Sequence, residues 1–146
     1  MKVGKTFHIS YAHALAGHPG KCRNLHGHNA RIEVELEGEV DLISGMVADF
    51  EEIVEGIGDR VKRDLDHKLI LHSKDFLNRF HQLGDTEEVV LLRFPPTAEI
   101  LASLVRFWTK MRFPENQITV RFWETDTSFA ECRQYEVFHE HIEEGF

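Results

Sequence analysis

Cysteine and long apolar runs are both scarce in this sequence. Its two cysteines, Cys22 and Cys132, are too few for a disulfide-stapled scaffold, so we expect free thiols in a reducing compartment. No apolar run approaches the roughly 18 residues of a membrane span, which predicts that the protein has no membrane partner. The first residues, Met1–Lys5, lack the apolar stretch of a signal peptide, so we expect a cytoplasmic location.

Positive charge is also in short supply. The chain has 17 Lys and Arg against 25 Asp and Glu, a formal net charge of −8, whereas a nonspecific nucleic-acid binder needs a basic surface. We therefore expect no nucleic-acid partner, although a local basic pocket would suffice for a phosphorylated small molecule. Apolar residues at 42% and charged residues at 29% are ordinary for a globular protein, and the length predicts one domain spanning 1–146.

Several segments alternate between apolar and polar residues, as half-buried strands do. Alternation predicts strands at 3–15, 26–37 and 117–124, and the tail from Tyr135 on could add a short strand. Because strands and helices fall in separate blocks, the expected fold is α+β.

Two further segments have the spacing of helices. Asp49 and Thr97 are expected helix N-caps, each followed by apolar residues at helical spacing. Gly56 and Gly58 weaken the first helix. Residues 68–93 are interpreted as an extra hairpin or insertion, with two short strands around a short helix.

Three of the ten histidines lie on the inward faces of the first two expected strands. His26 and His28 are two residues apart, so their rings project from one side, about 7 Å apart along the strand. His13 has the parity of the apolar face of its own strand, whereas His8 has the polar parity. Three imidazoles with an open fourth position are a recurrent catalytic zinc arrangement. The alternative is three core histidines that are satisfied by hydrogen bonds.

Cys22 lies in the loop between these two strands. Its basic neighbours Lys21 and Arg23 would favour the thiolate, and a thiol near a metal suits proton transfer or nucleophilic attack. The alternatives are an incidental loop cysteine or a fourth ligand of a closed zinc site. Cys132 is assigned a structural role.

Acidic residues complete the candidate set. Asp66 precedes His67, and a carboxylate can orient an imidazole and raise its pKa toward neutrality, although adjacent residues do not pair automatically. Glu124 has the parity of the apolar face of its strand, where a carboxylate needs a partner. It could grip a flat, amidine-like ring edge with two parallel hydrogen bonds, or it could pair with a buried arginine or a helix end.

Six short motifs, read in order, resemble the 6-pyruvoyl-tetrahydropterin synthase family, and the resemblance extends from about Phe7 to Ala130. Any one motif is weak, but six in order at compatible spacing are specific. The motifs are Ala12-His13, Cys22-Arg23-Asn24-Leu25-His26-Gly27-His28, Gly45-Met46-Val47-Ala48-Asp49-Phe50, Leu65-Asp66-His67, Pro96-Thr97-Ala98-Glu99 and Glu124-Thr125.

The resemblance implies roles for individual residues. It implies Zn²⁺ held by the three histidines, Cys22 as the catalytic thiol, and Asp66 with His67 as its proton relay. It also implies substrate binding by Glu124, which would anchor a pterin ring, and by Thr97.

The same resemblance implies a fold and an assembly. The expected architecture is the tunnelling fold, a four-stranded antiparallel sheet with two helices packed on one face. Subunits would join their sheets into barrels, as a homohexamer built from two trimers, with active sites between subunits. Pairing between subunits would also cover the sheet edges that a small sheet leaves open.

The implied substrate is 7,8-dihydroneopterin triphosphate. The short spacing between Cys22 and His26 resembles the 6-carboxytetrahydropterin synthase branch of the queuosine pathway, which releases acetaldehyde and triphosphate. The alternatives are a 6-pyruvoyl-tetrahydropterin synthase, which eliminates triphosphate only, and a noncatalytic zinc- or pterin-binding protein. The chain departs from the family pattern at Tyr11, where a small residue is usual, at Cys132, and in the length of 68–93. None of these departures removes a proposed catalytic group, and all would alter the size of the pocket.

Overall fold

The computed structural model describes residues 1–83 and 88–134 of the chain. Two long strands, β1 (Lys2–His13) and β2 (His26–Glu37), form the centre of its sheet. They pair antiparallel along their whole length, from Lys2 opposite Glu37 to His13 opposite His26. Burial alternates along both strands, as their hydrophobic pattern predicted.

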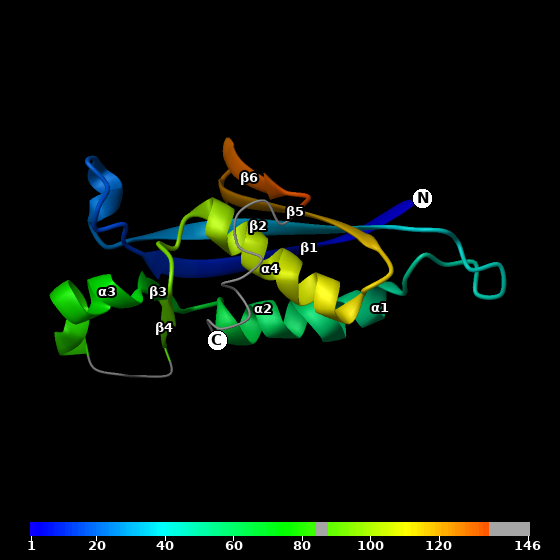
Figure 1. Cartoon of the computed structure of the whole chain (residues 1–146), viewed down its shortest axis with the longest axis horizontal. Helices are drawn as coiled ribbons and strands as arrows, with labels where there is room; N and C mark the ends of the chain where they lie inside the picture. The colour runs from blue at the N-terminus through cyan, green and yellow to red at the C-terminus, as the bar shows by residue number, and fades with distance from the viewer. Residues whose placement is uncertain (84–87, 135–146) are drawn as a thin grey trace.

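In the part of the chain that the structure describes, the sheet has six strands, in the order β4-β3-β1-β2-β5-β6 (Figure 1). β5 (Gln117–Thr125) and β6 (Ser128–Cys132) continue the antiparallel pairing beyond β2. β3 (Leu69–His72) and β4 (Val89–Leu92) are parallel to β1 on its other side. The prediction of a four-stranded antiparallel sheet therefore describes β1, β2, β5 and β6 only, because two parallel strands extend that unit.

The sequence analysis missed β6, whose five residues are too few to show a clear alternation. The strand expected from Tyr135 on lies outside the described residues.

The insertion at 68–93 is not a hairpin. β3 and β4 run parallel, and parallel strands require a crossover instead of a tight turn. The crossover begins with the helical turns α3 (Ser73–Asp75), η3 (Phe76–Phe80) and η4 (His81–Leu83). A small separate core holds this part against the end of β1, and it contains Ala14, Leu71 and Phe76.

Two longer helical segments pack on one face of the sheet, as expected. The first runs through α1 (Phe50–Ile53), the π-helical turn η2 (Val54–Gly58) and α2 (Asp59–Asp64). The second is α4 (Ala98–Arg112). The expected caps are present: the side chain of Asp49 accepts a hydrogen bond from the backbone N–H of Glu51, and that of Thr97 accepts one from Ile100.

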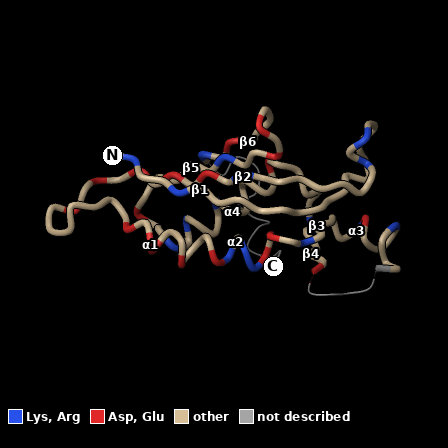
Figure 2. The backbone as a smooth tube through the Cα atoms, turned by 180° about the vertical axis from the view of Figure 1, so that it is seen from behind, with Lys and Arg blue, Asp and Glu red and all other residues tan. Residues whose placement is uncertain are grey.

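The main core lies between these helices and the inward faces of β1, β2 and β5. Its fully buried members include Ile32, Val34, Ile57, Val105 and Phe122. Figure 2 shows basic and acidic residues mixed along both the sheet and the helices. Within 1–83 and 88–134, no helix has the length and apolar character needed to cross a membrane.

Candidate metal centre

Strand pairing brings three histidines together at one end of the sheet. His13 ends β1 directly opposite His26, and His28 lies opposite Tyr11, so all three rings project from the inward face. One ring nitrogen from each histidine lies within 4.8 Å of those of the other two, and the ring centroids are 4.6 to 5.1 Å apart. This is a cluster that could hold a metal ion.

Backbone carbonyls determine which nitrogens of the cluster carry protons. Nδ1 of His13 lies 2.7 Å from the carbonyl of Pro96, and Nδ1 of His26 lies 2.7 Å from that of Asn24. Because a carbonyl can only accept a hydrogen bond, each Nδ1 must donate. In the neutral ring, each Nε2 then has a free lone pair.

The free lone pairs of His13 and His26 face each other. Their Nε2 atoms are 3.1 Å apart, too close for two acceptors with nothing between them. Two ligands of one tetrahedral zinc ion, each about 2.0–2.1 Å from it, lie about 3.3 Å apart. The observed separation therefore suits two nitrogens that share a cation.

His28 and His13 both have the chemistry of metal ligands. Nε2 of His28 is buried and has no hydrogen-bond partner among the described residues. Burial lowers the pKa of His13, an effect that the Pro96 carbonyl and the charge of Glu124 only partly offset, so the ring is neutral near pH 7. Neutral imidazoles with free Nε2 atoms are the form that divalent transition metals bind.

Glu124 on β5 borders the cluster, as its parity predicted. Its Oε1 lies 3.8 Å from Nε2 of His13 and accepts a hydrogen bond from the Tyr11 hydroxyl at 3.1 Å. Its side chain is 25% exposed, so solvent still reaches the carboxylate. Within 1–83 and 88–134, no hydrogen bond or ion pair joins it to the alternative partners, an arginine or a helix end.

Tyr11 is a site residue that the sequence analysis did not identify as functional. It is 4% exposed, and its ring meets those of His13 and His28 with centroids 5.2 and 5.7 Å away. Burial raises the pKa of the Tyr11 hydroxyl, and the charge and hydrogen bond of Glu124 add to this effect. Its parity, which matches that of His13, was the available signal. The hydrogen bond from His13 to the Pro96 carbonyl had no signal in the sequence.

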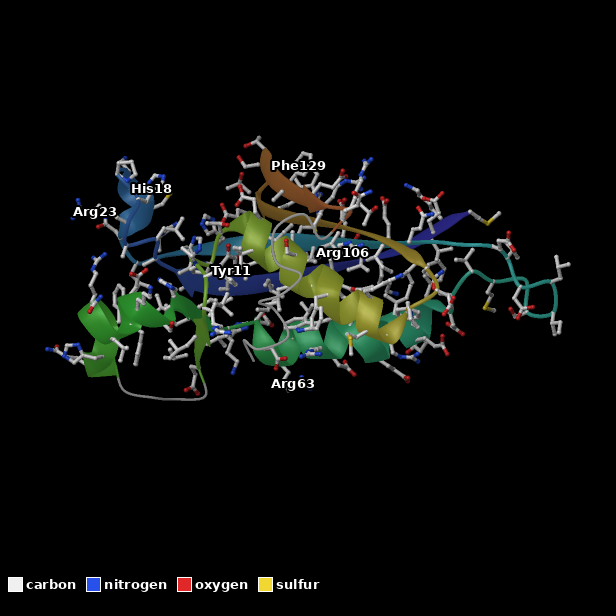
Figure 3. All side chains as sticks on the ribbon, in the orientation of Figure 1. Tyr11, His18, Arg23, Arg63, Arg106 and Phe129 are labelled. Atoms are coloured by element: carbon white, nitrogen blue, oxygen red, sulfur yellow. The ribbon has the colours of Figure 1, made fainter. Side chains whose placement is uncertain are left out.

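Cys22 lies in the loop between β1 and β2. It is half-buried within the 3₁₀ turn η1 (Lys21–Arg23), and its carbonyl accepts a hydrogen bond from the N–H of Leu15. Among the described residues, no hydrogen bond joins its thiol to the histidines. Figure 3 shows the neighbouring Arg23 and His18 in the loop that projects beyond the sheet, whereas Tyr11 lies inside the molecule.

Asp66 and His67 lie along the open edge of β1. The carboxylate of Asp66 accepts a hydrogen bond from the N–H of Ser10 and lies 3.1 Å from Nδ1 of His67. The expected pair therefore forms, but the His67 side chain is 82% exposed. Within the described residues, no hydrogen bond or ion pair joins it to the histidine cluster or to Cys22. His67 adopts a left-handed backbone conformation, with φ of 58°.

Thr97 is the N-cap residue of α4. Its hydroxyl accepts the hydrogen bond from Ile100 N–H at 3.4 Å, and it follows Pro96, whose carbonyl orients His13. The start of this helix therefore borders the cluster.

The fold and the histidine cluster together define a class of protein. A family model described as 6-pyruvoyl tetrahydropterin synthase matches residues 2–135, so the chain belongs to that family.

Two relatives and one solved structure illustrate the match. The 6-carboxy-5,6,7,8-tetrahydropterin synthase of Haemophilus influenzae is 30% identical over 91% of this chain and 99% of its own length. The protein of the same name from Rickettsia bellii is 28% identical over 90% and 99%, respectively. The structure of 6-pyruvoyl tetrahydropterin synthase from Caenorhabditis elegans matches 92% of this chain and 95% of its own, with a TM-score of 0.69 at 23% identity. The match to this solved structure shows that the two chains share a fold.

Proposed function

We propose that this chain is a zinc-dependent lyase that converts 7,8-dihydroneopterin triphosphate to 6-carboxy-5,6,7,8-tetrahydropterin, with release of acetaldehyde and triphosphate. The observation that carries the proposal is the pair of facing Nε2 atoms, 3.1 Å apart, whose protons lie on the opposite sides of the two rings. That arrangement suits a shared metal cation, and three neutral imidazoles with an open position favour zinc that acts in catalysis.

His13, His26 and His28 would hold the ion. When bound, zinc supplies Lewis-acid chemistry that makes hydroxyl groups of the substrate side chain more acidic. The hydrogen bonds from His13 to Pro96 and from His26 to Asn24 hold the two rings in the orientation that ligation requires.

Glu124 would bind the pterin ring. Its carboxylate lies beside the cluster and is reachable from solvent, so it can accept hydrogen bonds from the N–H groups on the edge of the heterocycle. Thr97 lies next to Pro96 at the same end of the sheet, where its backbone can border the substrate.

Cys22, Asp66 and His67 would move protons between the side chain and the ring. Cys22 lies in the loop that leads from β1 to the zinc ligands of β2. The exposure of His67 favours an arrangement in which the Asp66–His67 pair of one subunit serves the site of another. A homohexamer with sites between subunits, as the family resemblance implies, would provide that arrangement.

The choice of product rests on the relatives. Both relatives above that match about nine-tenths of this chain carry the 6-carboxy name, so the same reaction is proposed for this chain by analogy. A role of this chain in the queuosine pathway is part of that proposal.

Product analysis tests this function directly. Zinc-loaded protein incubated with 7,8-dihydroneopterin triphosphate should yield 6-carboxytetrahydropterin and acetaldehyde by mass spectrometry. A diketone product without acetaldehyde would instead assign the 6-pyruvoyl activity. Zinc-loaded protein that leaves the substrate unchanged would indicate a noncatalytic binding protein. Cys22→Ala should keep its zinc and lose turnover by at least about a hundredfold, as expected for a proton-transfer group.

A further inference from the structure

The proposed reaction gives no task to Tyr11, although this residue touches most of the site. Its hydroxyl is buried and donates to Oε1 of Glu124 at 3.1 Å. Its ring packs with T-shaped geometry against His13 and Phe122, which restricts where the hydroxyl can go. Tyr11 is therefore a rigid donor with one acceptor, the carboxylate that borders the histidine cluster.

That carboxylate is close to becoming a metal ligand itself. Oε1 of Glu124 lies 3.8 Å from Nε2 of His13, and two ligands of one tetrahedral zinc ion are separated by about 3.3 Å. A small rotation of the Glu124 side chain would bring the oxygen into the fourth position. Three histidines with a carboxylate would form a closed site, which is typical of structural zinc and leaves no place for a substrate.

We propose that Tyr11 is a positioning residue that holds the carboxylate of Glu124 beside the metal instead of on it. The hydrogen bond occupies a lone pair of Oε1 and fixes its place, so the fourth position stays open for an oxygen of the substrate. The carboxylate also stays available to the N–H groups of the heterocycle. This inference rests on the proposed function, since it assumes that the three histidines bind zinc.

Tyr11→Phe tests the inference because it keeps the ring and removes only the hydroxyl. The released carboxylate should coordinate the ion, so zinc affinity, measured by competition with a chromogenic chelator, should rise by about tenfold, within the range for partners of metal ligands. The visible spectrum of the Co²⁺-substituted protein should shift with the new oxygen ligand. Affinity for a dihydropterin should fall. A residue that only fills the core would weaken zinc and pterin binding together.

Glu124→Gln provides the matched control. Alone it should leave zinc affinity and the Co²⁺ spectrum unchanged, because the side chain is held off the metal while Tyr11 is present. In Tyr11→Phe/Glu124→Gln, zinc affinity should return to the wild-type value, since a neutral amide is a poor zinc ligand.

Three results would overturn the role of Tyr11: zinc affinity that is unchanged in Tyr11→Phe, zinc affinity that falls in it, or zinc affinity that falls in Glu124→Gln alone. If Tyr11→Phe does not fold, the Co²⁺ spectrum of Glu124→Gln decides, because a changed spectrum would mean that Glu124 is already a ligand and an unchanged one supports the inference. A wild-type protein that binds no zinc would overturn the proposed function as well, so the two failures are distinguishable.

Discussion

His13 and His8 belong to the same strand but face opposite sides of the sheet. His13 is 1% exposed and its ring meets those of the two other cluster histidines, whereas His8 is exposed and pairs across the strands with Arg31. At the scale of single residues, the position of a ring on the pleat therefore decides whether it joins the cluster that could hold a metal ion.

We expect His13→Ala to abolish zinc binding and His8→Ala to leave zinc content intact. The first substitution removes one of the three proposed ligands, and the second removes a solvated ring on the far face. Metal analysis of both purified variants, with circular dichroism to confirm folding, checks the prediction. Equal loss of zinc in the two variants would contradict the observed strand parity.

At the scale of elements, the π-helical turn between α1 and α2 shows where packing overrides helix propensity. Gly58 has φ of −60°, which any residue can adopt. Glycine is therefore needed here because there is no room for a side chain, and not because of its backbone conformation. A Cβ at this position would lie 2.6 Å from the Phe7 ring. Gly56 faces the flexible side chain of Arg112 instead, at 3.0 Å.

We expect Gly58→Ala to destabilise the protein by about 1–3 kcal/mol, the usual cost of overpacking. Gly56→Ala is the matched control and should be neutral or stabilise by up to about 1 kcal/mol, because alanine favours a helix and Arg112 can move. Urea unfolding of the two variants measures the difference. A stabilised Gly58→Ala would show that β1 and the helix are not packed as described.

Thr97 begins α4 at the point where the chain borders the histidine cluster. We expect Thr97→Ala to lower stability by about 1 kcal/mol, the typical value of an N-cap, and Thr97→Ser to retain stability because serine also caps helices. Thermal unfolding checks this expectation, and unchanged stability in Thr97→Ala would argue that the 3.4 Å hydrogen bond has no effect.

At the scale of the whole molecule, the edge of β1 is only partly covered. β3 pairs with β1 at Ala12 and His13 only, and Asp66 and His67 form hydrogen bonds with the backbone of Ser10. No described strand pairs with the rest of this edge. An open edge is a template for another chain, and among the described residues β6 is the edge strand on the opposite side of the sheet. These edges suit the proposed assembly.

The backbone of Thr6 offers a way to test that assembly. The N–H groups of Ser10 and Ala12 point to the open edge, so that of Thr6, which has the same parity, also points away from β2. We expect Thr6→Pro to block pairing between subunits without removing a bond from the β1–β2 ladder. Light scattering should show a smaller particle than for the wild type.

Thr6→Ala is the control for this prediction and should assemble normally, because it keeps the N–H group. A Thr6→Pro protein of unchanged mass would show that the β1 edge takes no part in assembly. Loss of activity together with the change in mass would further support sites that need residues of two subunits.

The sequence by itself determined which face of each long strand is buried and where the main helices begin. Alternation and capping are local patterns, so the parity of His13, His26 and His28 and the caps at Asp49 and Thr97 could be read from neighbours in the chain. The motif order also indicated the family, which the family model confirms.

Only the tertiary structure decided how distant segments meet. The parallel pairing of β3 and β4 depends on a crossover whose direction no local pattern encodes. The hydrogen bonds from His13 to Pro96 and from Tyr11 to Glu124 join residues 83 and 113 positions apart. Strand periodicity states which side a residue faces, but the partner it finds there depends on how sheet and helices pack.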